Sequence, residues 1–295
     1  MTTPRATALA SPATPITARL LRRMPLPPCS DVEGKDDRGR VLVVGGSAEI
    51  AGAVALSGVA ALRTGAGKLQ LATASSAAAA MMVAVPEARV IGLDVDGDGR
   101  LSDVPQALAE AASRTDALVL GPGMESSDAS TRFASALLRH GDAPCVLDAG
   151  ALAAYDTPRD GPLILTPHAG EMAELTSRSR EDVTARAAEV ARDFALATRT
   201  VMVLKGPTTH VAGRDGTVWR HYSDCPGLAT SGSGDVLAGV IAALIARGCT
   251  PEQAAVWGVW LHARAGRRAA LRIGRLGFLA REVADELPRV LGRYS

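Results

Sequence analysis

The most informative stretch of the sequence is Cys225-Pro226-Gly227-Leu228-Ala229-Thr230-Ser231-Gly232-Ser233-Gly234-Asp235-Val236-Leu237-Ala238-Gly239. Two glycines bracket a serine in this stretch, an aspartate follows them, and apolar residues then recur at helical spacing as far as Ile245. A glycine-rich turn that leads into a helix presents several unpaired backbone N–H groups, and the helix dipole adds partial positive charge. The pattern therefore predicts an anion site suited to phosphate, at the start of a helix that ends near Gly248.

Asp235 stands at the rim of this anion site, where phosphate binding does not explain it, because a carboxylate repels phosphate. A carboxylate in this place can accept the proton of a hydroxyl group that is about to receive a phosphoryl group. The alternative is structural, since an aspartate can also do no more than cap a helix. The motifs elsewhere in the chain favour the catalytic interpretation.

Composition bounds the kind of protein. The 295 residues are 47% apolar and carry a net charge of +1, which gives no reason to propose nucleic acid or an anionic membrane surface as a partner. No uncharged apolar run reaches the length of about 18 residues that a membrane span needs. The four cysteines are widely spaced, so neither a zinc site nor a disulfide framework is indicated and a cytoplasmic location is expected.

Residues 1–30 differ from the rest of the chain. They hold four arginines and no acidic residue, as a targeting peptide would, but six prolines argue against an amphipathic helix. A disordered or draped tail is the expected structure there. Residues 31–295 contain no linker or repeat and are expected to form one domain.

From Arg40 onward, short runs rich in valine and leucine alternate with helical patterns. This alternation predicts an α/β fold with a mostly parallel central sheet and helices on both faces. Two strands joined by a Gly-Arg-Asp-Gly turn, 209–211 and 218–221, are expected to extend that sheet as a hairpin. The other predicted strands are 41–44, 69–72, 117–120, 145–147, 163–165 and 201–204, and the predicted helices are 52–63, 104–112, 131–139, 180–197, 251–271 and 277–290.

Loops rich in glycine and polar residues follow five of these strands. Ligands of open α/β sheets bind beyond the carboxyl ends of the strands, so five such loops on one edge predict the lining of a cleft. Each loop alone has a structural alternative: a tight turn for Gly121-Pro122-Gly123, a helix-capping role for His168 and a solvated surface position for Lys205. Only three residues of the chain are lysine, which argues against an incidental Lys205. The five loops begin with Gly45-Gly46-Ser47, Gly121-Pro122-Gly123, Asp148-Ala149-Gly150, Thr166-Pro167-His168-Ala169-Gly170-Glu171 and Lys205-Gly206-Pro207-Thr208-Thr209.

Taken together, these motifs closely resemble those of the ADP-dependent (S)-NAD(P)H-hydrate dehydratase family, within the ribokinase-like superfamily. The resemblance covers about residues 31–285. The Asp235 motif alone would suggest only a ribokinase-like phosphotransferase, and Thr166–Glu171 with the Gly-Pro-Gly loop narrows it to this family. Its other carriers are Gly45-Gly46-Ser47, Gly52-Ala53, Ala61-Leu62-Arg63-Thr64-Gly65-Ala66-Gly67, Asp148-Ala149 and Leu204-Lys205-Gly206.

The resemblance implies a repair enzyme that acts on the (6S)-hydrated forms of NADH and NADPH. ADP or ATP would phosphorylate the C6 hydroxyl, phosphate would leave, and NADH or NADPH would be regenerated. The chemistry is physically sensible because hydroxide is a poor leaving group, phosphate is a good one, and the ring nitrogen can push it out. Such an enzyme has mainly to position two ligands and stabilise charge.

The resemblance also implies roles for individual residues. Ala53, Gly123 and His168 would contact the hydrated dinucleotide, and Asp235 would touch its hydroxyl and act as the base. Mg²⁺ would arrive on the nucleotide, since the sequence offers no carboxylate cage for a metal site of the protein's own. The adenine nucleotide would be bound by Lys205, Gly206, Pro207, Thr208, Thr209 and Gly234.

Four features depart from the family pattern. Ile50 stands where an aromatic residue is usual, and Met124-Glu125 replaces Leu-Gly after the Gly-Pro-Gly loop. Pro207-Thr208 makes the Lys205 loop stiffer and bulkier than Ala-Gly, and Cys225 replaces an asparagine before Pro-Gly. These departures bear on affinity and nucleotide preference more than on the type of reaction.

The resemblance further favours a homotetramer or homodimer. Residues 1–30 are too few for the epimerase domain that often precedes this family's domain, so a separate epimerase is expected. Two other functions remain open: a ribokinase-like kinase of a small alcohol such as a vitamin precursor, and a non-catalytic nucleotide-binding protein. The kinase would keep a stable phosphorylated product and would need no cleft for a dinucleotide. The binding protein would have no use for a base at the phosphate site.

Overall fold

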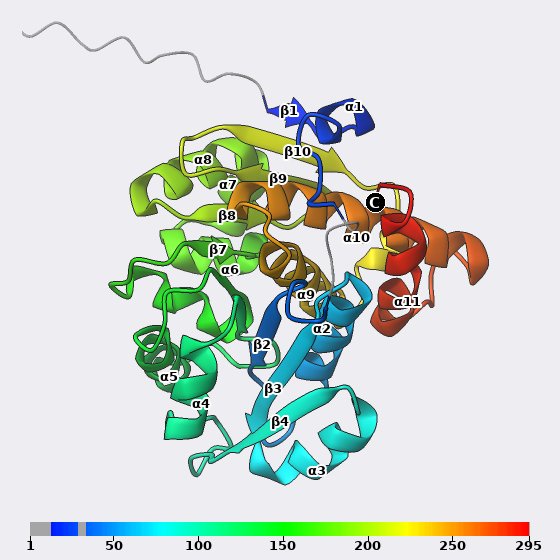
Figure 1. Cartoon of the computed structure of the whole chain (residues 1–295). Coiled ribbons are helices and arrows are strands. Elements are labelled where there is room, and N and C mark those ends of the chain that lie inside the picture. Colours follow the sequence, from blue (N-terminus) through cyan, green and yellow to red (C-terminus); the bar gives the residue numbers. More distant parts are fainter. Residues whose placement is uncertain (1–12, 29–33, 295) are drawn as a thin grey trace, which may run out of the picture.

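Runs of buried valine and leucine form the middle of a ten-stranded sheet in the computed structural model, which describes residues 13–28 and 34–294 (Figure 1). The strand order is β1-β10-β9-β8-β7-β6-β5-β2-β3-β4. Neighbouring strands from β8 to β4 in this order are parallel, whereas β9 is antiparallel to both β8 and β10. The strands are β1 (Thr14–Pro15), β2 (Arg40–Val44), β3 (Lys68–Ala74), β4 (Ala88–Leu93), β5 (Ala117–Leu120), β6 (Cys145–Leu147), β7 (Leu163–Leu165), β8 (Val201–Leu204), β9 (Thr208–Ala212) and β10 (Val218–Tyr222).

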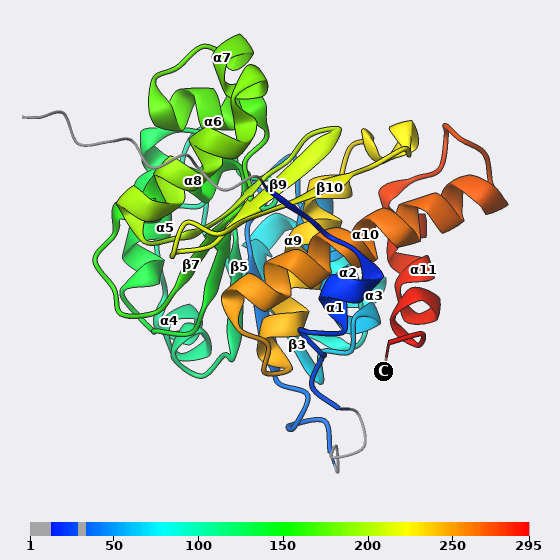
Figure 2. The same ribbon diagram turned by 90° about the horizontal axis from the view of Figure 1, so that it is seen from above.

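Helices cover both faces of the sheet, as Figure 2 shows. Side chains alternate along each strand, so Val41 and Val43 enter one core while Leu42 and Val44 enter the other. Helices α2, α9, α10 and α11 pack on the first face and α4 to α8 on the second. Their bounds are α1 (Ala18–Leu21), α2 (Gly52–Arg63), α3 (Ser75–Ala84), α4 (Gln106–Ser113), α5 (Asp128–Leu138), α6 (Ala169–Thr176), α7 (Arg180–Ala185), α8 (Ala187–Thr198), α9 (Ser233–Ala246), α10 (Pro251–Arg272) and α11 (Ala280–Leu291), with 3₁₀ turns η1 (Ala149–Asp156) and η2 (Pro226–Leu228).

This architecture confirms the predicted α/β fold with a mostly parallel sheet, and the predicted 209–218 hairpin is present as β9 and β10. The single helix predicted over residues 180–197 is wrong. At Arg186 the backbone leaves helical geometry (φ −118°, ψ 30°), so the segment divides into α7 and α8. Strands β1 and β4 and helices α1, α3 and α6 were not predicted.

Helices α2 and α9 cross unusually closely on the first face. A Cβ atom added to Gly239 of α9 would lie 2.0 Å from the carbonyl oxygen of Ser57 in α2. Real contacts of this kind do not occur at that distance, so only glycine permits the two backbones to approach. The crossing matters for function because α9 carries the predicted anion site at its first turn.

Gly239→Ala is expected to lower the free energy of unfolding by about 1–3 kcal/mol, because the new methyl group must push α2 away from α9. Gly52→Ala is the matched control, since a Cβ there meets no atom within 4 Å. That helix-favouring change is expected to be neutral or to stabilise by up to about 1 kcal/mol. Chemical denaturation of both variants measures the difference, and equal stability would show that the crossing is not tight.

The described part of the N-terminal region packs against the sheet edge (Figure 1). Strand β1 pairs in parallel with β10, and Ile16 and Leu21 are buried. The indole Nε1 of Trp257 in α10 donates to the carbonyl oxygen of Met24 at 2.6 Å. Of the tail expected over residues 1–30, residues 1–12 and 29–30 lie outside the described residues. Among the described helices, none has the length and apolar character to cross a membrane.

Candidate active site

The five strand-end loops lie at one edge of the sheet, as predicted. Strands β2, β5, β6, β7 and β8 are adjacent and parallel, so their carboxyl ends coincide. Backbone hydrogen bonds join neighbouring loops: Gly46 N–H donates to the Pro122 carbonyl at 2.7 Å, and Lys205 N–H to the Pro167 carbonyl at 2.8 Å. The loops therefore form one continuous surface.

Helix α9 begins at this edge with its first turn built as predicted. Gly232 occupies the N-cap position with a left-handed backbone (φ +84°), and Ser233, Gly234 and Asp235 form the first helical turn. This left-handed conformation favours glycine at the cap, and a Cβ there would also lie 2.5 Å from the end of the Leu56 side chain, which would have to shift. No side chain caps α9, so the interpretation of Asp235 as the helix cap finds no support.

Lys205 points at the start of α9 and is held there by a buried carboxylate. Its Nζ donates to Oδ1 of Asp148 at 2.9 Å, and the same oxygen accepts from Thr166 Oγ1 at 2.7 Å. A Cβ on Gly234 would lie 3.2 Å from that Nζ, so the ammonium group sits beside the helix N-terminus. Ammonium and helix dipole together make the region attractive to phosphate.

Three carboxylates surround Lys205. Besides Asp148, Glu171 approaches its Nζ to 3.9 Å, and Asp235 contributes a favourable charge interaction. Burial by itself lowers the pKa of the Lys205 ammonium, but the carboxylates outweigh burial and raise that pKa above its ordinary value. Lys205 is therefore a fixed positive charge and not a solvated surface lysine.

The pKa of the Asp235 carboxyl group is raised, which suits a catalytic base. Burial raises the pKa of its carboxyl group to about 7, the charge of Asp148 adds to the rise, and Lys205 opposes it. A carboxylate with an ordinary pKa is a weak base, whereas one that titrates near neutral pH accepts a proton efficiently. The geometry thus supplies a base, a cation and a helix N-terminus within one small volume.

His168 proves to be the N-cap of α6. Its Nδ1 accepts from the backbone N–H groups of Gly170 and Glu171 at 3.0 and 3.1 Å, and Glu171 returns a bond to the His168 N–H at 2.7 Å. The capping alternative is therefore present in the structure. Because Nδ1 accepts, Nε2 carries the proton of the neutral ring, and the imidazole is 61% exposed. The ring can still donate one hydrogen bond to a ligand.

Gly123 and Ala53 meet at the β5 and β2 end of the same edge. A Cβ on Gly123 (φ +72°) would lie 2.6 Å from the Ile50 carbonyl oxygen and 3.0 Å from the Ala53 Cβ. Glycine is therefore needed in this turn, and it brings the two predicted contacts together. The loop from Lys205 to Thr209 follows β8, on the other side of Asp235 from Gly123. The Ser223 N–H donates to the Pro207 carbonyl of this loop at 3.0 Å.

Sequence reasoning missed two residues that support the site. The sequence places Asp148 in a strand-end loop without a role, although an acidic residue at the same edge as Lys205 is a usable signal of an ion pair. His262 in α10 gave no local signal, yet its Nε2 lies 3.1 Å from Ser233 Oγ beneath the start of α9. Burial lowers the pKa of His262 to about 4, so its ring is neutral at physiological pH.

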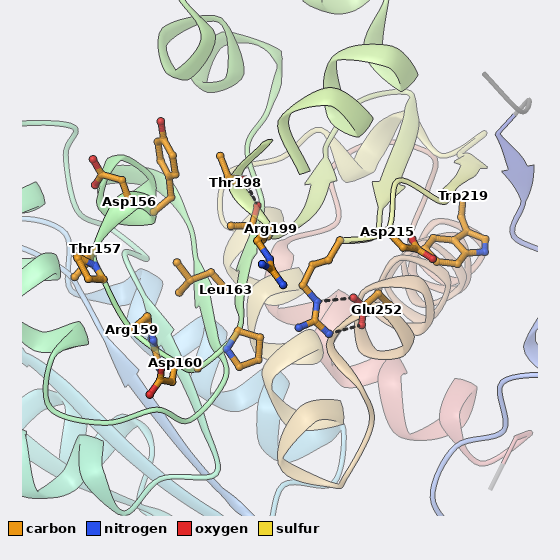
Figure 3. Close-up of a pocket in the computed structure, with 16 residues that line it drawn as sticks. Asp156, Thr157, Arg159, Asp160, Leu163, Thr198, Arg199, Asp215, Trp219 and Glu252 are labelled. Carbon is orange, nitrogen blue, oxygen red and sulfur yellow. Dashed lines mark hydrogen bonds and ion pairs between the residues drawn. The ribbon is translucent and has the colours of Figure 1, made fainter. Parts of the chain in front are cut away.

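A cavity of about 1000 Å³ lies elsewhere. It opens at the amino ends of β7 and β8, where Leu163 and Thr200 line it, and so at the opposite edge of the sheet (Figure 3). Arg214 and Glu252 form an ion pair of 2.7 Å inside it. Its lining includes neither Lys205 nor Asp235, so its size alone does not make it the site. Within the described chain, no three His, Cys, Asp or Glu side chains gather to hold a metal ion.

Comparison with known proteins finds relatives over most of the chain. A family model described as NAD(P)H-hydrate dehydratase matches residues 41–289. An ADP-dependent (S)-NAD(P)H-hydrate dehydratase of Xanthomonas campestris is 50% identical over 94% of this chain and 96% of its own length. A bifunctional NAD(P)H-hydrate repair enzyme of Moorella thermoacetica is 38% identical over 86% of this chain, which there spans 49% of the longer protein.

Solved structures extend the agreement to three dimensions. The ADP/ATP-dependent NAD(P)H-hydrate dehydratase of Bacillus subtilis, co-crystallised with ATP and Mg²⁺, superposes with a TM-score of 0.84 at 31% identity, covering 97% of this chain and all of that one. A ribokinase-like superfamily protein of Enterococcus faecalis superposes with a TM-score of 0.81 at 23% identity, covering 96% of each chain. The second match concerns the fold alone, and it confirms the expected ribokinase-like architecture.

Proposed function

Because the chain belongs to the NAD(P)H-hydrate dehydratase family, we propose that the cluster around Asp235 is where it carries out that family's reaction. The enzyme is a hydro-lyase that uses ADP or ATP to return (6S)-hydrated NADH and NADPH to NADH and NADPH. The observation that supports the placement is the convergence of a carboxyl group with a pKa of about 7, the Lys205 ammonium and the start of α9.

In the proposed mechanism Asp235 accepts the proton of the C6 hydroxyl as the hydroxyl oxygen attacks the terminal phosphorus of the nucleotide. The bond from that phosphorus to the bridging oxygen breaks, and AMP or ADP leaves. The phosphorylated C6 oxygen then departs with its bonding electrons as inorganic phosphate, while the ring nitrogen donates its lone pair. Loss of the proton from the neighbouring carbon completes the dihydronicotinamide ring. Water is thereby removed at the expense of one phosphoanhydride bond.

The nucleotide is proposed to lie against Lys205, Gly206, Pro207, Thr208, Thr209 and Gly234. Backbone N–H groups at the start of α9 would bind its phosphates, and Lys205 would neutralise the charge that develops during transfer. Magnesium fits this arrangement, because Mg²⁺ typically binds through phosphates and one or two carboxylates. Asp148 and Glu171 are the residues that would hold it, and the ion would neutralise phosphate charge.

Hydrated NADH with either nucleotide tests the proposed function. Recovery of the near-ultraviolet absorbance of the dihydronicotinamide ring, together with release of phosphate, is expected only from a dehydratase. A kinase of a small alcohol would instead transfer the phosphoryl group to a stable product and leave the hydrate unchanged. A non-catalytic nucleotide-binding protein would bind ADP without releasing phosphate.

Ala53, Gly123 and His168 are proposed to contact the hydrated dinucleotide. His168→Ala removes both the Nε2 donor and the cap of α6, so it is expected to raise KM for the hydrate about two- to tenfold and to lower stability by about 1 kcal/mol. His168→Asn is the informative partner, because asparagine is a good N-cap. It is expected to restore stability but not KM.

Steady-state kinetics and thermal denaturation of the two variants separate the two roles of His168. Nucleotide affinity is expected to change little in either variant. If asparagine restored KM together with stability, His168 would be a structural cap only, and the hydrate would have to be placed elsewhere on the edge.

Two further features are proposed for the enzyme in its cell. It is proposed to work as a homotetramer or homodimer, which light scattering of the purified protein measures. Since the reaction uses the S form of the hydrate, a separate epimerase is proposed to convert the R form. Addition of such an activity is then expected to double the amount of NADH recovered from an equal mixture of the two forms.

A further inference from the structure

A smaller cavity, of about 390 Å³, opens at the same edge of the sheet as Asp235. Three loops line it: residues 46–49 after β2, residues 97–101 after β4 and residues 124–125 after β5. The cavity adjoins the proposed substrate contacts, because Gly46 lines it and the Gly46 Cα lies 3.3 Å from the position of a Cβ on Gly123. It is therefore an extension of the proposed site.

The strand order indicates that the adenosine half of the hydrated dinucleotide extends toward this cavity. The loop proposed for the nucleotide follows β8, at the side of the sheet that continues into β9 and β10. A dinucleotide with its C6 hydroxyl at Asp235 must then extend toward β5, β2, β3 and β4. Helix α2 spans the distance between the two sites: Leu56 packs at Gly232, and Ala53, three residues earlier in the helix and therefore about 4.5 Å away along its axis, packs at Gly123. An extended dinucleotide readily covers that span.

The walls of the cavity are negatively charged. Glu49, Asp98 and Glu125 line it, and Arg100 is the one basic residue among the described residues that do so. Arg100 lies between two of these carboxylates, since its Nη1 pairs with Asp98 and its Nε lies 3.9 Å from Glu125. A phosphate that entered the cavity would therefore meet three acidic side chains and only one basic side chain.

We infer that this cavity takes the adenosine ribose of the hydrated dinucleotide and selects hydrated NADH over hydrated NADPH. The inference rests on the proposed function. The two substrates differ only in the phosphate on the 2′ oxygen of that ribose. Carboxylates accept hydrogen bonds from a free 2′ hydroxyl and repel a 2′ phosphate, which is how dinucleotide sites commonly discriminate.

The wild-type enzyme is expected to show a kcat/KM about tenfold higher for hydrated NADH than for hydrated NADPH at low ionic strength. The preference is expected to shrink as salt is added, because exposed charges are screened beyond about 10 Å at 0.1 M. A preference that came from shape alone would not depend on salt.

Three variants test the charge argument. Asp98→Asn with Glu125→Gln removes both acidic partners of Arg100 and is expected to move the ratio toward hydrated NADPH by about tenfold or more. Arg100→Gln makes the cavity more acidic and is expected to move the ratio the other way. Glu87→Gln is the matched control, since Glu87 is exposed and precedes β4 at the opposite edge of the sheet. It is expected to leave the ratio unchanged.

Binding of the products separates this inference from the proposed function. NADH and NADPH are titrated against wild type and the double variant, with the fluorescence of the dihydronicotinamide ring as the signal. Equal affinities that the double variant leaves unchanged overturn the inference, whether or not the hydrates are turned over. Tighter binding of NADH that reverses in the double variant supports it. Absence of hydrate turnover in a protein that still discriminates between the products would overturn the proposed function alone.

Discussion

Replacing Asp235 with asparagine is expected to lower kcat for the hydrate by about 10²–10⁴-fold while leaving nucleotide affinity nearly unchanged. The substitution removes the proposed base but spares the backbone N–H groups at the start of α9. Initial rates and nucleotide titrations measure the two quantities. Asp128→Asn is the matched control, because Asp128 also lies in the first turn of a helix, α5. It is expected to change neither.

A decrease of less than tenfold in kcat would reduce Asp235 to a helix-stabilising residue. The control is informative because both aspartates lie in the first turn of a helix. The interaction of an exposed carboxylate with the helix dipole stabilises a helix by about 0.3–1 kcal/mol. A rate effect common to both variants would therefore come from helix stability. A rate effect seen only in Asp235→Asn would come from the loss of the catalytic base.

The raised pKa of Asp235 makes two further outcomes measurable. A base must be deprotonated, so kcat/KM is expected to fall as the pH drops below about 7, the pKa of the free enzyme. Stability moves in the opposite sense. Because the folded protein holds this proton more tightly than the unfolded chain, the stabilisation is present at low pH and is lost as the pH rises through about 7.

Asp235→Asn is therefore expected to be more stable than wild type above pH 7, by on the order of 2 kcal/mol. Denaturation at pH 6 and pH 8 gives the comparison. A variant that lost activity and stability together at pH 8 would contradict the account, since it would show that the carboxylate holds the fold together.

Lys205→Ala is expected to raise Kd for the nucleotide by about 10- to 100-fold, as a charge-assisted contact of about 1.5–3 kcal/mol is removed. Binding of the hydrated dinucleotide is expected to weaken less. The structure adds a second effect, because the substitution leaves Asp148, which is 3% exposed, without its cation. The free energy of unfolding is expected to fall by on the order of 2–3 kcal/mol.

The double variant Lys205→Ala with Asp148→Asn separates the two effects. Asparagine removes the unpaired charge and its Oδ1 can still accept from Thr166, so stability is expected to recover while nucleotide affinity does not. Isothermal titration and denaturation of the single and double variants complete the cycle. Equal loss of affinity for both ligands, or no loss for either, would remove this loop from the nucleotide site.

The middle of the sheet was predictable from sequence because strands buried on both faces are apolar throughout. Strands β6, β7 and β8 have the bounds predicted for them. At the β4 edge of the sheet, the apolar pattern that predicts a strand is absent. Buried and exposed residues mix along Ala88–Leu93, and Gly92 interrupts the pattern. Helix α3 is rich in alanine and buries only Met81, while Val83 is 83% exposed, so no apolar periodicity marks it.

The chemistry of the site was predictable in part for a related reason. Gly234, Asp235 and Lys205 lie in local motifs whose physical purpose can be read from a few adjacent residues. Their supporting contacts join distant segments, as Asp148 does with Lys205 and His262 with Ser233. Such contacts follow from the packing of whole elements. His168 differs from both groups, because its sequence pattern is compatible with a helix cap and with a ligand contact. The cap depends only on neighbouring residues and can be checked in the fold, whereas a ligand contact depends on the ligand.

The pairing of β1 with β10 has a consequence for the order in which the protein forms during synthesis. Thr14 pairs with Trp219, so its partner lies more than 200 residues later in the chain. At a translation rate of about 5–20 residues per second, the N-terminal segment waits roughly 10–40 seconds for that strand. Ile16 is next to this pairing and is buried only in the completed fold, since its N–H donates to the Arg220 carbonyl. The first described segment to leave the ribosome is thus among the last to reach its native place.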